Sequence, residues 1–255
     1  MIRVLPIIIN PHLTPDDKRL TDIYSVDIKS WYIDVLNDLR EVFNEEFVMV
    51  EPIDQDWIPE KQDGFQYSSQ EYLAVIQNPR LHHEPDKVNM WKFIDSHRLI
   101  DRKLANEFDE VHVLGGPFMG FYESQMVGLS AIPCNSEPIM ASCPNFAIMG
   151  YNYERGRCEA LEDMGHRAEF ILASLYPNYM RTFNSGTGTI HKPFNTTKDY
   201  DWDNLNVAME HLNGDVKTNN CTAWGCTGLG YIKWWFSRLA PEMRRDVIHF
   251  DNWKR

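Results

Sequence analysis

The sequence predicts an α/β fold in which helices cover both faces of a mainly parallel sheet. Short and almost wholly apolar runs recur along the chain, which is typical of strands buried on both faces. Longer segments between them carry apolar residues every three or four positions, as amphipathic helices do. This alternation favours a three-layer arrangement of the flavodoxin-like or Rossmann-like type, with an incomplete barrel as the second choice.

The first half of the chain supplies the first strands and helices. Residues 2–9 (IRVLPIII) are predicted to form a buried strand, because Asn-Pro bounds the apolar run. Residues 27–44 have helical spacing, and residues 46–50 form a second strand before a proline. A polar, aromatic-rich loop over 54–67 then precedes a helical pattern over 69–76.

The next elements repeat the same alternation. Residues 88–108 carry a helical pattern, and a third strand over 110–114 runs into Gly-Gly-Pro. A fourth strand over 146–149 runs into Gly-Tyr-Asn. The longest helix is predicted over about 153–175, ended by Pro177.

The C-terminal region is predicted to be rich in loops. Residues 183–227 are rich in Gly, Asn, Thr and Asp, and a last helix follows over 228–239. Ile248 and Phe250 are predicted to add an edge strand. Because no segment has the composition of a linker, residues 1–255 are expected to form a single domain.

The charge of the chain limits its partners. Lys and Arg number 25 against 37 Asp and Glu, which gives a formal net charge of −12. Such a surface repels phosphate groups, so we expect binding neither to nucleic acid nor to anionic lipid. No apolar run reaches the roughly 20 residues that span a bilayer. A small-molecule or polymer substrate is therefore the expected partner, and the oligomeric state is not predicted.

The cysteines indicate a reducing compartment. An odd count of five in a chain of this length does not suggest a disulfide framework, so we expect at most one disulfide, with Cys158 reduced. The apolar N-terminal run is better explained as a strand than as a signal sequence. We expect a cytoplasmic protein, or a secreted one if a leader has been removed.

Functional groups are predicted where the strands end. In open parallel sheets, ligands bind beyond the carboxyl ends of the strands. His12 follows the first predicted strand, Glu123 lies in the segment after the third, and Glu154 follows the fourth. We predict that these three side chains meet at one edge of the sheet as catalytic groups, with Glu154 in the first turn of its helix.

Two carboxylates among aromatic rings are the equipment of a hydrolase that acts on a glycan or a peptide-like polymer. Glu154 and Glu123 would be the acid and the base, and neighbouring polar and aromatic side chains would bind substrate. The predicted substrate-binding residues are Tyr151, Asn152, Tyr153, Trp202 and Trp224. A structural alternative is that Asn152 caps the helix and Glu154 only complements the helix dipole.

A metal site is a further hypothesis. Glu162, His166 and Glu169 fall on one side of the longest predicted helix, at spacings that suit shared coordination of one divalent ion such as zinc. The alternative is a solvated polar face with helical ion pairs. The alternating aspartates at 199–203 offer calcium instead, although most of a calcium-loop signature is missing.

Two non-catalytic functions are the alternatives. Aromatic loops would let a binding protein hold carbohydrate or peptide, and the acidic surface would suit a protein partner. An enzyme should hold two or more carboxyl groups with shifted pKa values in a pocket, whereas a binding protein should expose Trp in a shallow groove.

Overall fold

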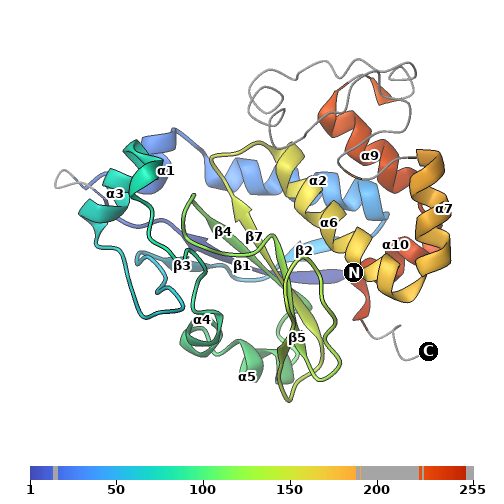
Figure 1. The fold of residues 1–255 in the computed structure, drawn as a ribbon, viewed down its shortest axis with the longest axis horizontal. Helices are drawn as coiled ribbons and strands as arrows, with labels where there is room; N and C mark the ends of the chain where they lie inside the picture. Colours follow the sequence, from blue (N-terminus) through green and yellow to red (C-terminus); the bar gives the residue numbers. More distant parts are fainter. Residues whose placement is uncertain (14–16, 188–189, 191–223, 226, 251–255) are drawn as a thin grey trace.

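The computed structural model describes residues 1–13, 17–187, 190, 224–225 and 227–250 (Figure 1). Within these ranges the chain forms a mixed sheet of seven strands that are mostly parallel, together with helices. The predicted α/β class is therefore confirmed. The strand order is β2-β1-β4-β7-β5-β6, and β3 pairs with β1 beyond β2.

The centre of the sheet consists of three parallel neighbours, β1, β4 and β7, as the apolar runs predict. Leu5 of β1 lies opposite Val111 of β4, and Val113 of β4 lies opposite Gly150 of β7. Only β5 runs antiparallel to its neighbour β7. The strands are β1 (Ile2–Ile9), β2 (Phe47–Met49), β3 (Ile53–Gln55), β4 (Glu110–Gly115), β5 (Ser124–Gly128), β6 (Ile139–Met140) and β7 (Phe146–Asn152).

Helices lie around this sheet. Figure 1 shows α2 and α6 on one side and α4 and α5 on the other, with α7, α9 and α10 packed beside α6. No helix in the described ranges is both long and apolar enough to cross a membrane. The α-helices are α1 (Leu20–Tyr24), α2 (Ile28–Phe43), α3 (Ser69–Gln77), α4 (Met90–Ser96), α5 (Leu99–Leu104), α6 (Arg157–Leu175), α7 (Pro177–Thr187), α9 (Gly228–Arg238) and α10 (Pro241–Ile248).

The start of α6 differs from the prediction. The helix begins at Arg157 with Gly156 as its N-cap, so Glu154 precedes the helix and Asn152 does not cap it. The backbone N–H of Tyr153 donates to the carbonyl of Gly115 (3.0 Å), and its hydroxyl donates to the carbonyl of Ile9 (3.2 Å). These bonds hold Tyr153 against the sheet, and a turn must follow before the helix can start.

Two prolines begin helices where the sequence predicts other structures. Pro177 is the first residue of α7, so the predicted loop region starts with helix, and Pro241 is the first residue of α10. Ile248 ends α10 and is not part of an edge strand. Proline fits the first helical position because the N–H that it lacks would have no partner there.

The short strand β5 has no apolar signature and was not predicted. Its first residues are buried polar side chains: the Ser124 hydroxyl donates to the carbonyl of Cys134 (2.9 Å), and the Gln125 amide donates to the carbonyl of Glu137 (2.8 Å). A polar strand can be buried when its side chains form hydrogen bonds with backbone carbonyl groups of neighbouring loops in this way. Strands β3 and β6 were missed because they are only three and two residues long.

A buried ionic network ties α6 to the sheet. Glu110, His112 and Arg167 are each 0% exposed. The Arg167 guanidinium donates to Glu110 Oε2 (2.6 Å) and to the carbonyl of Val247 (2.8 Å). His112 bridges Glu110 (3.0 Å) and the Tyr32 hydroxyl (2.9 Å). The network thus connects β4 with α2, α6 and α10.

The cysteines give the first testable expectation. Cys134 and Cys143 are buried free thiols, and Cys158 packs against the core. Since two of the five are free, the other three can form at most one disulfide. Thiol titration of the denatured, unreduced protein should therefore give at least three thiols per chain. A count of one thiol would contradict both the structure and a reducing compartment.

Candidate functional site

The carboxyl ends of β1, β4 and β7 share one edge of the sheet, as predicted. The chain leaves β1 toward β2 on one side and returns at β4 on the other, which is the switch point where open sheets bind ligands. Side chains fill the space beside Gly116 at this point. A Cβ there would lie 2.6 Å from Leu20 Cδ2 and 2.8 Å from the Tyr72 hydroxyl, so the glycine serves close packing.

Glu154 lies in the turn after β7, among tyrosines. Its side chain is partly buried, with the Oε2 atom inside the protein. Burial, and then the charge of Glu154, raises the pKa of Tyr24 to about 12 and raises the pKa of Tyr153. Burial also raises the pKa of Tyr72, with smaller contributions from Tyr153, Tyr24 and Glu154. The turn therefore presents a carboxylate beside neutral tyrosine hydroxyls, with Tyr153 next to it as predicted.

A second group of side chains, here called the acid cluster, comprises Glu123, Glu162, Asp163 and His166. Glu123 directly precedes β5, and its carbonyl accepts from the N–H of Gly150 (3.2 Å), which fixes it beside β7. Asn135 donates to its carboxylate (2.6 Å). The other three members lie on α6, which follows β7. The antiparallel pairing of β5 with β7 thus brings Glu123 to the start of α6.

Two members of the acid cluster, Asp163 and His166, have raised pKa values, so both favour their protonated forms. Burial, reinforced by the charges of Glu123 and Glu162, raises the pKa of Asp163 well above its usual value and favours its protonated form. Burial alone would lower the pKa of His166, but Glu162 and Glu169 outweigh it and raise that pKa to about 10. A carboxyl group that favours its neutral form and an imidazole that favours its charged form are therefore neighbours.

The polar face of α6 is buried, which overturns the solvated alternative. Glu159 is 6%, Glu162 5% and His166 9% exposed. Helices α7 and α9 pack along α6, and a Cβ at Gly165 would lie 2.4 Å from Ile190 Cγ1. The charges on this face are stable inside the protein because they pair with one another.

The predicted metal ligands do lie together, but as ion pairs. His166 Nε2 lies 3.8 Å from Glu162 Oε1, and His166 Nδ1 lies 3.7 Å from Glu169 Oε2. Among the described residues, no group of three or more His, Cys, Asp and Glu side chains has an arrangement that could hold a metal ion. The aspartates at 199–203 lie outside the described residues.

His12 does not belong to the acid cluster. Its Nδ1 atom lies 2.6 Å from Asp17 Oδ1, and its carbonyl accepts from the Ser69 hydroxyl (2.7 Å). The loop after β1 therefore binds His12 to its own neighbours and to the start of α3. That His12 meets Glu123 and Glu154 at one site stays a prediction.

The predicted substrate-binding residues differ in how far they are buried. Tyr151 is 1% exposed and its ring lies 5.1 Å from that of His112, so it belongs to the core. Asn152 is the last residue of β7 and partly exposed. Trp224 is buried against Tyr231, at 5.3 Å between ring centres. Trp202 lies outside the described residues.

Asp163 was missed by sequence reasoning. The helical wheel drew attention to Glu162, His166 and Glu169, and an aspartate next to Glu162 looked like one more surface charge. The available signal was the concentration of acidic residues near the start of a helix that follows a central strand. Nothing local indicates that Glu123 lies beside it.

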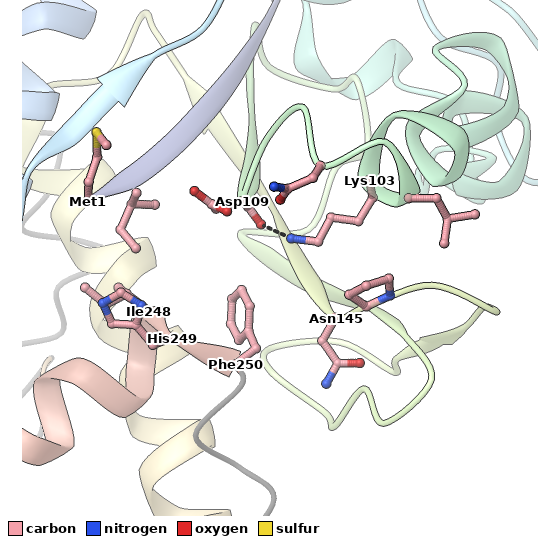
Figure 2. A pocket seen from close by; sticks show the side chains of 11 residues that line it. Met1, Lys103, Asp109, Asn145, Ile248, His249 and Phe250 are labelled. Carbon is pink, nitrogen blue, oxygen red and sulfur yellow. Dashed lines mark hydrogen bonds between the residues drawn. The ribbon is translucent and has the colours of Figure 1, made fainter.

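A cavity of about 360 Å³ lies at the opposite, amino edge of the sheet (Figure 2). Its polar side chains bond to the surrounding protein. Lys103 donates to the carbonyl of Asp109 (3.0 Å), and the Asp109 carboxylate accepts from Arg3 (2.8 Å). The cavity is thus remote from the acid cluster, and its charged groups are engaged in holding the structure together.

Comparisons with known protein families, with curated proteins and with solved structures found no match. The function is therefore inferred from the chemistry of the site.

Proposed function

We propose that this protein is a hydrolase that cleaves a glycan or a peptide-like polymer through the acid cluster, with Asp163 as general acid and Glu123 as general base. The observation that carries the proposal is the close grouping of Glu123, Glu162 and Asp163, in which burial and the neighbouring carboxylates raise the pKa of Asp163 well above its usual value. Environments that separate the protonation states of neighbouring carboxyl groups are typical of acid–base catalysis. Asp163 thus replaces Glu154 as the partner of Glu123.

In the proposed reaction, Asp163 gives its proton to the leaving oxygen or nitrogen of the scissile bond. Glu123 takes a proton from water, whose oxygen forms the new bond to the substrate. One water molecule is consumed, and the proton gained by Glu123 returns to Asp163 through solvent. Each proton transfer of this kind accelerates a reaction by about 10²–10⁴-fold.

The remaining polar groups support this chemistry. The His166 imidazolium offsets the repulsion among the carboxylates, so that only Asp163 has to remain neutral. The carboxylate of Glu154, in the turn that follows β7, is proposed to bind substrate. The hydroxyl of Tyr24, at the end of α1, is proposed to bind substrate with it. No step of the reaction is assigned to the predicted metal ligands.

The finer fold type and the compartment are also proposals. The change of direction between β1 and β4 supports the three-layer Rossmann-like or flavodoxin-like type. The free thiols Cys134 and Cys143 support a reducing compartment such as the cytoplasm.

The proposal is tested by polymer hydrolysis with the full chain. Xylan, β-glucan and chitosan would be assayed for new reducing ends, and casein for new amino ends. We expect one of them to be cleaved, and Glu123→Gln to lower the rate about 10²-fold or more, because the base is lost while size is kept. Glu154→Gln should raise KM more than it lowers kcat, as expected for a group that binds substrate.

Glu137→Gln is the matched control, because Glu137 is an exposed carboxylate in the loop that follows β5. This variant should cleave at the wild-type rate. The absence of cleavage of all four polymers, or an unchanged rate in Glu123→Gln, would overturn the proposed function.

A further inference from the structure

A small pocket lies beyond the carboxyl end of β3, between the following loop and α4. It has a volume of about 220 Å³. We call it the Trp57 pocket, and its lining residues are Trp57, Pro59, Glu60, Gln66, Asn89, Lys92, Phe93 and Ser96. None of these residues belongs to the acid cluster.

Trp57 is both exposed and rigidly supported. Its side chain is 38% exposed, although large aromatic residues are usually covered. The His97 ring stacks on the indole at 6.0 Å and 9°, and His97 Nε2 is 2.8 Å from Gln55 Oε1. Gln55, which is buried, also donates to the carbonyl of Trp57 (2.7 Å). The indole is thus held in place before any ligand arrives.

The layer behind the indole carries no charge. Burial, and then the charge of Arg102, lowers the pKa of His97 to about 4. At neutral pH, His97 is therefore an uncharged support. An aromatic surface of this kind attracts apolar C–H groups or another ring, and does not specifically select an anion.

The polar side chains opposite are also fixed. Asn89 donates to Glu60 Oε1 (3.2 Å), and Lys92 donates to Glu60 Oε2. The backbone N–H of Asn89 donates to the carbonyl of Glu60 (2.8 Å), which locks the loop onto the start of α4. A carboxylate, an amide and an ammonium group thus meet at one wall of the pocket. The Lys92 ammonium has three donors, and Glu60 accepts from one of them.

The geometry points to a saccharide-binding site in the Trp57 pocket. A sugar ring has an apolar C–H face that fits an indole, and hydroxyls on its edge that both donate and accept. The trio of Glu60, Asn89 and Lys92 offers acceptors and donors for these hydroxyls. The volume is below the roughly 300 Å³ of sites for larger ligands, so one sugar unit of a chain would enter. The ionised Glu60 disfavours a phosphate group.

The site is independent of the proposed hydrolase reaction, and its test measures binding alone. Cellopentaose, laminaripentaose and N-acetylchitopentaose would each be titrated into the full-length protein and followed by calorimetry. We expect one of them to bind in a saturable manner, with a Kd on the order of 1 mM or below. Trp57→Ala should weaken that binding about tenfold or more, because the stacking surface is lost.

Trp91→Ala is the matched control, since Trp91 is an exposed tryptophan of α4 that does not line the pocket. Its binding should equal that of the wild type. Glu60→Gln, which keeps the size of the side chain, should weaken binding about threefold or more and gives a second readout if Trp57→Ala is unstable. Glu123→Gln should bind normally, which separates this site from the acid cluster.

The inference is overturned if none of the three oligosaccharides binds at about 10 mM, a concentration well above the expected Kd. It is also overturned if the folded Trp57→Ala and Glu60→Gln variants both bind as tightly as the wild type.

Discussion

Asp163→Asn is expected to lower kcat on the cleaved polymer by about 10²–10⁴-fold. Asparagine keeps the size of the side chain but has no proton of suitable acidity to give to the leaving group. The charges of Glu123 and Glu162, which raise the pKa of Asp163, would then act on a group that does not titrate. The measurement is the initial rate at saturating substrate, where a change in binding does not contribute.

The pH profile provides a sharper test of the same role. Because the reaction needs protonated Asp163, activity on the alkaline side should fall as the pH rises through its raised pKa. Glu162→Gln removes one of the charges that raise this pKa, so the alkaline fall should move to lower pH. Asp101→Asn, at an exposed carboxylate of α5, should change neither rate nor profile. An Asp163→Asn variant within threefold of the wild-type kcat would exclude Asp163 as the acid.

Arg167→Ala is expected to destabilise the protein by about 3–5 kcal/mol, because it leaves the buried Glu110 carboxylate without its cationic partner. Arg167 and Glu110 are both 0% exposed and bond at 2.6 Å. The variant also loses the bond to the carbonyl of Val247, which ties α10 to α6. Urea unfolding at pH 7 would measure the change in the free energy of unfolding.

The stabilisation by Glu110 should also depend on pH. Burial opposes its ionisation, but Arg167 and His112 prevail and lower the pKa of Glu110 from 4.5 to about 2. A lowered pKa in the folded state stabilises the protein above the unfolded value, near 4.5, and this contribution is lost as the pH falls to about 2. The difference between wild type and Arg167→Ala should therefore shrink over that range.

Arg102→Ala is the control for this series, because Arg102 forms a surface ion pair with Glu107 at 2.6 Å. Pairs of this kind contribute about 0–1 kcal/mol. Equal losses of stability in Arg102→Ala and Arg167→Ala would contradict the buried network. So would a folded Arg167→Ala protein with the unfolding free energy of the wild type.

The sequence by itself determined the α/β class and the central strands. Strands β1 and β7 are nearly unbroken apolar runs, which is the pattern of buried parallel strands, and β4 is apolar apart from Glu110 and His112. The helix α2 was equally clear, because its apolar residues fall on one side and Asp27 caps its start by accepting from the N–H groups of Lys29 and Ser30. These features are local, so neighbouring residues suffice to specify them.

The sequence also indicated that polar groups gather at the carboxyl edge of the sheet, but it could not assign partners among them. Glu123 and Glu154 follow β4 and β7 in the chain, as predicted. The side chains that surround each of them could not be predicted from the sequence. Glu154 lies among tyrosines from other segments, and Glu123 faces Asp163 because β5 runs antiparallel to β7. Strand β5 is polar and short, so its pairing has no sequence signature.

Only the tertiary structure decided that the polar face of α6 lies inside the protein. Helical periodicity shows that Glu162 and His166 lie on the same side of the helix, away from its apolar face. It does not show what packs against that side. Helices α7 and α9 pack along α6 and leave Glu162 and His166 buried, whereas Glu123 and Asp163 remain partly exposed. This burial makes the charges act strongly on one another. The raised pKa of Asp163, on which the proposed chemistry depends, arises in part from Glu123 in a distant segment, and no local pattern of residues encodes that contact.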